Sequence, residues 1–248
     1  MRNPAFVLAL TLVSLASLSA KDTHRTVKMA AKSQDKSASS SHAAATFGPA
    51  PFTTVVVDAG HGGHDPGGIP ENLLPEKDVA LDIARRLSYA VEDAGLRSML
   101  TRDDDTFVTL QDRVNVSNAQ ESAIFVSIHF NAAPRREARG IETYYSKSAE
   151  GAALAARIQQ RLAATTTGEN RGIKAADFFV LRKNKDLCVL VECGFLTNPE
   201  DVALALNDDY REKVAREICA AIVDYRNSLA GKNDALHFAA LSDRFRLN

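Results

Sequence analysis

The sequence has no tryptophan, few aromatic residues and no excess of either charge. Lysine and arginine together number 30 and aspartate and glutamate 31, which gives a formal net charge of −1. A nucleic-acid-binding domain usually carries a clear basic excess, so we expect no nucleic-acid partner. The chain of 248 residues has room for one domain with extensions, and no internal repeat is visible.

Long hydrophobic runs are also lacking. The one apolar run near the N-terminus, 5–18, follows Arg2, ends in small residues and is too short to span a bilayer comfortably. This pattern predicts a secretory signal peptide over residues 1–20, with a short membrane anchor as the alternative. We therefore expect a secreted protein with no stable membrane insertion after signal cleavage. No cysteine follows the run, so a lipoprotein is not expected.

Cysteine is scarce, with only Cys188, Cys193 and Cys219 in the chain. The first two fall on one predicted strand at an odd separation, so their side chains point to opposite faces of a sheet. They are badly placed to bridge each other, and an α/β domain of this size needs no disulfide. We expect all three to be buried free thiols.

The remaining chain divides into a linker, a domain and a tail. Residues 21–46 are rich in Lys, Ser and Ala without apolar periodicity, which predicts a flexible linker. We expect residues 47–230 to form one folded domain. Residues 231–248 lack a clear pattern, which predicts a loose C-terminal tail. Apolar runs predict strands at 54–58, 96–100, 124–128, 141–145, 178–181 and 188–191. Apolar stripes and caps predict helices over 76–94, from 109, around 154–162, from 198 and around 214–225. The alternation predicts an α/β fold: a single domain with a mainly parallel central sheet covered by helices on both faces.

Polar residues follow three of the predicted strands. His61 comes after the first, His129 ends the third and Glu192 ends the last, while Glu76 begins the helix after the first strand. Parallel strands bring such residues to the carboxyl edge of the sheet, where α/β proteins place their sites. Two histidines and a carboxylate form a catalytic zinc set, and a second carboxylate can move protons. His64 is an alternative metal ligand: if it bound the metal together with His61, Glu76 would not be needed as a ligand.

Several motifs resemble those of the zinc-dependent N-acetylmuramoyl-L-alanine amidases, the bacterial cell-wall amidases. The similarity covers about residues 53 to 228 in the family's order. The matching segments are Val57-Asp58-Ala59-Gly60-His61-Gly62-Gly63 with Asp65-Pro66-Gly67, Glu76-Lys77-Asp78, Leu100-Thr101-Arg102 with Arg113, Ser127-Ile128-His129-Phe130-Asn131-Ala132, Gly140-Ile141-Glu142-Thr143-Tyr144-Tyr145, Asn170-Arg171-Gly172-Ile173-Lys174, and Val191-Glu192-Cys193-Gly194-Phe195-Leu196-Thr197-Asn198. His64 and Cys193 depart from the residues usual in the family.

The resemblance implies roles for six residues. It implies that His61, Glu76 and His129 bind Zn²⁺ and that Glu192 is the catalytic acid–base. It places Asn131 and Arg171 near the cleft, where we interpret them as substrate-binding. The only segment between the third ligand motif and the next strand is 133–139, so the blocking helix that some members insert there is not expected.

The implied activity is zinc-dependent hydrolysis of the amide bond between N-acetylmuramic acid and L-alanine in peptidoglycan, in cell-wall remodelling or daughter-cell separation. It implies peptidoglycan as the partner and the periplasm or cell envelope as the location, and we expect a monomer. A periplasmic activator stays an open alternative. The zinc set by itself also fits a zinc peptidase or deacetylase, and a third alternative is a wall-binding module without activity.

Overall fold

The computed structural model describes residues 52–68 and 75–245, with side chains up to Ala230. The predicted signal peptide and linker lie outside the described residues. The elements, in chain order, are β1 (Thr54–Ala59), α1 (Glu76–Asp93), β2 (Arg97–Leu100), α2 (Leu110–Asn118), β3 (Ala123–Asn131), β4 (Ile141–Tyr145), α3 (Ala149–Thr165), β5 (Asn170–Ala175), α4 (Phe179–Arg182), β6 (Leu187–Phe195), α5 (Pro199–Leu206) and α6 (Asp208–Phe245).

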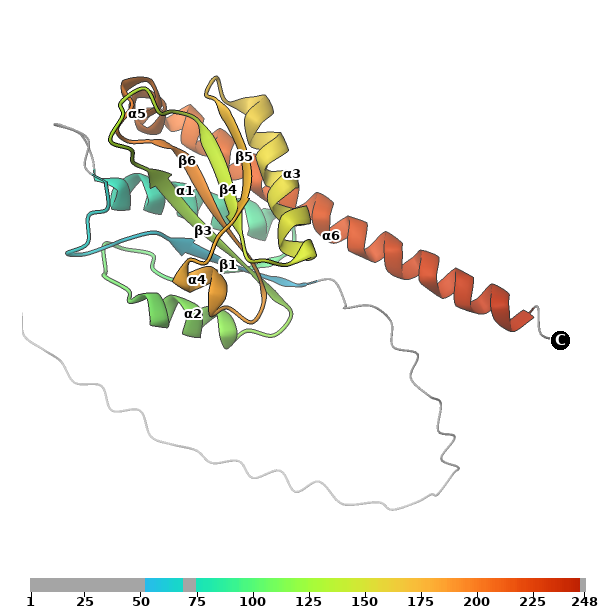
Figure 1. The fold of residues 1–248 in the computed structure, drawn as a ribbon. Helices are drawn as coiled ribbons and strands as arrows, with labels where there is room; N and C mark the ends of the chain where they lie inside the picture. The colour runs from blue at the N-terminus through green and yellow to red at the C-terminus, as the bar shows by residue number, and fades with distance from the viewer. Residues whose placement is uncertain (1–51, 69–74, 246–248) are drawn as a thin grey trace, which may run out of the picture. The chain divides into compact units, whose positions relative to one another are not determined.

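The six strands form one sheet in the order β2-β1-β3-β6-β4-β5 (Figure 1). Neighbouring strands are parallel except at β4, which runs antiparallel to β6. Helices lie on both faces, so the expected mainly parallel sheet with two helical layers is confirmed. No helix in the described part of the chain is both long enough and apolar enough to cross a membrane.

The two faces of the sheet are covered unequally. The larger core lies under α1, α3, α5 and α6 and includes Val55, Val57, Ile128 and Val191 from the central strands. The smaller core lies under the short helices α2 and α4 and includes Val56, Phe125, Cys188 and Leu190. Because α2 and α4 cover only part of their face, the rest of it is free to form a pocket. All three cysteines are free and buried, and Cys188 and Cys193 lie in different cores, as expected.

Helix ends follow local sequence rules. Thr109 caps α2 by accepting a hydrogen bond from the backbone of Asp112, and Asn198 caps α5 through Glu200 and Asp201. Burial of Val79, Ile83 and Leu87 on one stripe then fixes how α1 lies on the sheet.

Three predictions about local structure were wrong. The run 178–181 is not a strand: Phe178 caps the helix α4, and the residues after it are helical. A four-residue apolar run fits either structure, and here the backbone N–H of Arg182 bonds to the Phe178 carbonyl. The edge strand β5 was missed, since it is largely half-exposed and contains Gly172 at φ 76°. The helix α6 continues to Phe245 where we expected a loose tail. A single glycine, Gly231, lowers helix stability by only about 1 kcal/mol and does not end the helix.

A buried ion pair braces the sheet beneath the ends of β1 and β3. Asp58 accepts hydrogen bonds from Arg113 Nη1 at 2.8 Å, Ser127 Oγ at 2.6 Å and Thr101 Oγ1 at 2.7 Å. Both charged side chains are buried, at 1% and 4% exposure. Burial opposes ionisation of Asp58, but the Arg113 charge and these hydrogen bonds outweigh it and lower the pKa of its carboxyl.

We expect Asp58→Ala to lower the free energy of unfolding by about 3–5 kcal/mol, because it leaves the buried Arg113 charge without its partner. Urea unfolding measures this loss. The control is Arg216→Ala, which breaks an exposed pair with Glu212 and should change the same quantity by less than about 1 kcal/mol. Equal effects of the two substitutions would show that the pair does not brace the domain.

Candidate active site

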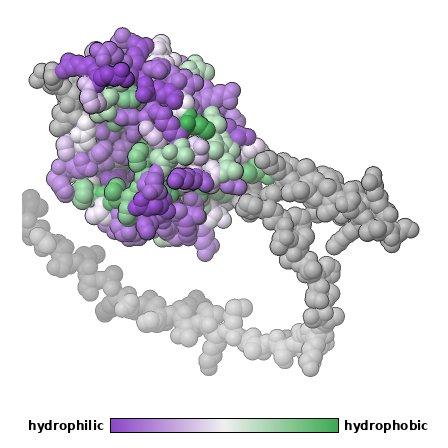
Figure 2. Space-filling model, in the orientation of Figure 1, coloured by the Kyte–Doolittle hydropathy of each residue, from purple (hydrophilic) through white to green (hydrophobic). Residues whose placement is uncertain are grey.

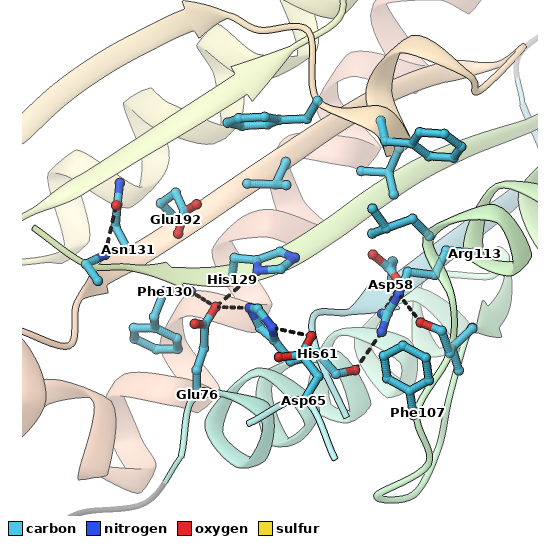
Figure 3. Close-up of a pocket in the computed structure, with 17 residues that line it drawn as sticks. Asp58, His61, Asp65, Glu76, Phe107, Arg113, His129, Phe130, Asn131 and Glu192 are labelled. Atoms are coloured by element: carbon cyan, nitrogen blue, oxygen red, sulfur yellow. Dashed lines mark hydrogen bonds and ion pairs between the residues drawn. The ribbon is translucent and has the colours of Figure 1, made fainter. Parts of the chain in front are cut away.

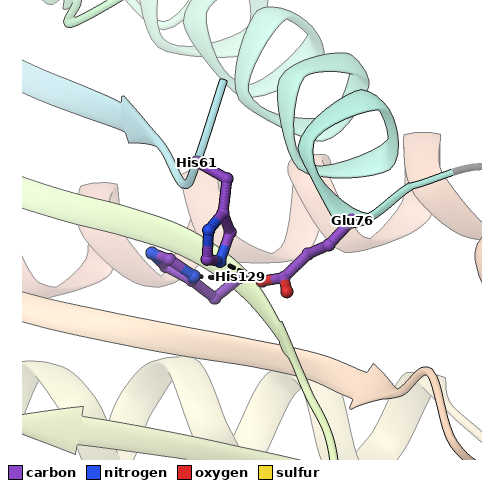
Figure 4. A group of neighbouring side chains, drawn as sticks. All are labelled: His61, Glu76 and His129. Atoms are coloured by element: carbon purple, nitrogen blue, oxygen red, sulfur yellow. Dashed lines mark hydrogen bonds and ion pairs between the residues drawn. The ribbon is translucent and has the colours of Figure 1, made fainter. Parts of the chain in front are cut away.

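The three predicted metal ligands converge at the carboxyl edge of the sheet. His61 follows β1, Glu76 is the first residue of α1 and His129 lies near the end of β3 (Figure 4). One ligand atom from each side chain can be chosen so that all lie within 4.8 Å of one another. The Glu76 Oε1 atom is 3.1 Å from His61 Nε2 and 3.0 Å from His129 Nδ1.

Two buried arginines hold the loop that carries His61. Arg102 donates to the carbonyls of Ala59 and Gly60, and Arg113 donates to the carbonyls of Ala59 and His61. His61 itself has φ 59°, a left-handed conformation that is unfavourable for a residue with a side chain. Such strain persists only where surrounding contacts enforce it, and it concentrates at functional sites. The side chain of His61 is therefore held in position by residues distant in sequence.

Close packing fixes the second histidine. A Cβ added at Gly60 would lie 2.3 Å from Cε1 of the His129 ring, so only glycine fits there. The pairing of β3 with β6 also shifts register between His129 and Asn131. Such irregularities re-aim side chains beside active sites.

Glu76 is held as a carboxylate. Its Oε1 accepts from the Phe130 backbone N–H and its Oε2 from the Gly68 backbone N–H, each at 2.9 Å. Burial opposes ionisation of Glu76, but the hydrogen bonds and charges of His129 and His61 outweigh it and lower its pKa far below the usual range. An ionised oxygen beside two imidazole nitrogens is a donor set for a divalent metal.

Asp65 orients His61 and was not assigned a role from the sequence. Its Oδ2 lies 2.9 Å from His61 Nδ1, so it accepts a hydrogen bond from the Nδ1–H group and leaves Nε2 to face Glu76. Burial opposes protonation of His61, but Glu76 and Asp65 outweigh it and raise the pKa of His61. A carboxylate on the outer nitrogen is the usual support of a metal-binding histidine. The residues therefore fit a zinc ion: two nitrogens, one carboxylate oxygen and an oriented tautomer.

Glu192 lies next to this group. It occupies β6 directly opposite His129 of β3 and lines the same pocket. Its Oε2 atom is inaccessible to solvent and has no hydrogen-bond partner in the described structure. Burial, with the nearby charges of Glu76 and Glu142, raises the pKa of Glu192 well above its usual range. Glu192 as a whole is half-buried and lines the pocket, so its carboxyl group lies between the sheet and any molecule bound there.

Asn131 and Arg171 both bind a carboxylate that sequence reasoning missed. Glu142 accepts from Asn131 Nδ2 at 2.7 Å, from Arg171 Nε at 3.0 Å and from the hydroxyl of Tyr144 at 2.6 Å, and Lys174 also pairs with it. Burial opposes ionisation of Glu142, but these donors lower its pKa. Asn131 lines the pocket, so the structure brings it, but not Arg171, to the pocket wall.

His64 stands apart from the ligand group. Its ring packs against Phe107 with centroids 4.0 Å apart, and it is not a member of the His61–Glu76–His129 group. The structure therefore favours Glu76 over the rival ligand.

A pocket of about 620 Å³ contains the His61–Glu76–His129 group and Glu192 (Figure 3). His61, Glu76, His129 and Glu192 line its polar part, and apolar residues of α2, α4 and the segment before α2 line the rest. An open pocket with a few convergent polar groups and shifted pKa values is typical of an enzyme active site.

Comparison with known proteins identifies the family. The profile of the N-acetylmuramoyl-L-alanine amidases matches residues 55–224, so the chain belongs to this family. The amidase LytC of Bacillus subtilis is 39% identical over 175 residues, which are 69% of this chain and 35% of LytC. The chain thus spans about a third of the length of that relative.

Solved structures show the same fold. An N-acetylmuramoyl-L-alanine amidase from Clostridium difficile 630 superposes with a TM-score of 0.69 at 34% identity, over 72% of this chain and 99% of the other. The CwlD amidase of Clostridioides difficile, solved in complex with the GerS lipoprotein, has a TM-score of 0.67 at 31% identity, over 71% of this chain and 99% of the other.

We expect one zinc ion per chain, and we expect His129→Ala to abolish its binding because a ligand is lost. Asp65→Ala should weaken zinc affinity about 10- to 100-fold by releasing the His61 ring. Competition with a chromogenic chelator measures both. His64→Ala is the matched control from the same loop and should bind zinc normally; a loss of zinc in this variant would contradict the ligand set.

Proposed function

We propose that this protein is a zinc-dependent N-acetylmuramoyl-L-alanine amidase that hydrolyses the bond between N-acetylmuramic acid and L-alanine in peptidoglycan. The observation that carries the proposal is one pocket in which the His61–Glu76–His129 group lies beside the carboxyl of Glu192, whose Oε2 has no hydrogen-bond partner in the described structure. Family membership supplies the substrate: the relatives are named for this reaction.

Each residue has a distinct task in the proposed reaction. His61, Glu76 and His129 would hold zinc, which supplies a Lewis acid for the carbonyl and makes water more acidic. Glu192 accepts a proton from the attacking water and delivers it to the departing alanine nitrogen as the carbon–nitrogen bond breaks. Asp65 keeps the His61 ring in the required tautomer, and the Phe130 and Gly68 N–H groups keep the Glu76 carboxylate turned toward the histidines.

Asn131 is proposed to contact substrate on the side of the pocket near Glu192, and Arg171 to contact the part of the substrate that extends beyond the pocket. Glu142 fixes both side chains, which leaves one Asn131 amide hydrogen and part of the Arg171 guanidinium for a ligand.

The proposed location is the cell envelope. We propose a secreted monomer with peptidoglycan as its partner. Secretion agrees with the predicted signal peptide, and one relative is named as a cell wall amidase. The solved CwlD–GerS complex shows that a related amidase associates with a lipoprotein. The alternative to an enzyme that acts alone is therefore one that needs an activator protein.

We expect Glu192→Gln to keep zinc and to lose activity by about a hundredfold or more, because the amide cannot carry the proton. Digestion of purified peptidoglycan, with the new alanine amino ends counted by mass spectrometry, measures the loss. Glu121→Gln is the control, since Glu121 lies just before β3, at the strand end away from the site. Near-normal turnover of Glu192→Gln would assign the proton transfer to another group.

We also expect the chain lacking residues 1–20 to digest peptidoglycan without an added protein. Between β3 and β4 the structure has only turns and irregular backbone over 132–140, so no helix from this segment plugs the pocket. The test compares the rate of peptidoglycan digestion by this chain alone, by this chain with an envelope protein fraction, and by a chain ending at Ala230. Similar rates are expected. A gain of tenfold or more only with the fraction would show that an activator is required, and a gain on truncation would assign inhibition to residues 231–248.

A further inference from the structure

The exposed apolar side chains of the domain gather at the pocket. Five large hydrophobic residues are exposed among the described side chains, and three of them, Phe107, Leu110 and Phe178, line the pocket of the candidate active site. Together with Val108, Phe179 and Val180 they form what we call the apolar shelf. Figure 2 shows apolar residues on the face of the domain that carries α2 and α4. Exposed apolar surface that continues into a pocket indicates ligand binding.

Contacts on both sides hold the shelf in place. The Phe107 ring packs on His64 with centroids 4.0 Å apart, and Phe178 meets Tyr144 edge-on at 4.9 Å. Helices α2 and α4, which contribute Leu110 and Val180, also pack against each other. The shelf is therefore formed before any ligand arrives, which reduces the entropy lost on binding.

The shelf offers no partner to a charged ligand. None of its six members is charged. Asp58 and Arg113, which line the pocket beside it, are buried and bonded to each other. The guanidinium of Arg182, which lies over the Phe179 ring, is paired with Asp177. Three further N–H groups of Arg113 donate to the carbonyls of Val108, Ala59 and His61. An ionic group placed on the shelf would lose hydration without compensation, so an uncharged ligand is favoured.

The opposite side of the pocket carries polar groups as well as Phe130. In Figure 3, His61 and His129 lie between Phe107 on one side and Asn131 and Glu192 on the other. Charged side chains lie behind Asn131, where Glu142 meets Arg171 and Lys174. The two ends of the pocket thus suit different chemistry.

The bond in the proposed reaction also joins two different halves. The muramic acid half is a pyranose ring with acetamido and lactyl groups and carries no charge once its carboxyl is in the amide. The stem peptide half carries free carboxylates. We propose, on the basis of the proposed function, that the apolar shelf binds the glycan half, with the C–H faces of the muramic acid and its neighbouring sugar against Phe107, Leu110 and Phe178. The stem peptide then extends past Asn131.

A comparison of two substrate series tests the orientation. One series keeps the tripeptide and adds sugars to the muramic acid, and the other keeps the disaccharide and lengthens the peptide from two to five residues. In the double variant Leu110→Ser with Phe178→Ser, we expect the gain in kcat/KM from the second sugar to fall about tenfold, mainly through KM. The gain from added peptide residues should not change.

Tyr89→Ser is the matched control, because Tyr89 is 70% exposed on α1 and does not line this pocket. Thermal unfolding of all variants confirms that they are folded. If the double variant loses the peptide-length gain and keeps the sugar gain, the shelf binds the peptide and the proposal is overturned. An unchanged sugar gain, matching Tyr89→Ser, would also overturn it.

A binding measurement separates this proposal from the proposed activity. A peptide-free tetrasaccharide of N-acetylglucosamine and N-acetylmuramic acid, with its lactyl carboxyls capped as methyl amides so that it carries no charge, should shift NMR signals of the shelf, with affinity at least fivefold weaker in the double variant. This result would support the glycan site even if the zinc-loaded wild-type chain cleaved no muropeptide, an outcome that would defeat the amidase proposal alone. Equal affinity in wild type and double variant would defeat the shelf proposal alone.

Discussion

Side-chain alternation along three parallel strands decides which face of the sheet holds the site. In the register of these strands, Asp58 lies opposite Ser127, Ser127 opposite Leu190, and His129 opposite Glu192. The residues between them, such as Val57, Ile128 and Val191, fill the core beneath α1 and α6. A slip of one residue would turn the site residues into that core, so burial of the core and assembly of the site depend on the same register.

The loop after β1 connects this register to the ligand group. Asp58 points down into the sheet and pairs with Arg113, while the same arginine reaches the carbonyls of Ala59 and His61. The ion pair thus stabilises the strand and also sets the backbone that presents the His61 ring. Because Arg113 comes from α2, the helix that walls the pocket also sets a ligand's position. The same Arg113 side chain therefore contributes both to the stability of the domain and to the position of a metal ligand.

Residues next to strong local signals could be predicted from the sequence. His61 and His129 stand at the ends of apolar runs, and Glu76 begins a helix, so their meeting at one edge follows from parallel pairing alone. Glu142 could not be found this way. It lies inside β4, and its position opposite Glu192 depends on the antiparallel pairing of β4 with β6, which is non-local. The prediction of a strand at 178–181 failed for a related reason, since tertiary packing decides the structure of so short an apolar run.

The pairing of Glu142 with Glu192 explains how the site can keep one carboxyl reactive. Two acidic residues directly opposite on neighbouring strands repel each other if both are ionised. Here Arg171 and Lys174 both pair with Glu142, and Asn131 and Tyr144 donate to it, whereas no described donor reaches the buried oxygen of Glu192. The pKa of Glu142 is therefore lowered and that of Glu192 is raised. Environments that push the pKa values of two neighbouring carboxyls apart commonly mark the carboxyl that transfers protons. The negative charge of Glu142 holds Asn131 and Arg171 in place and also makes ionisation of Glu192 harder. A single network of side chains therefore positions the polar side of the pocket and raises the pKa of its acid–base group.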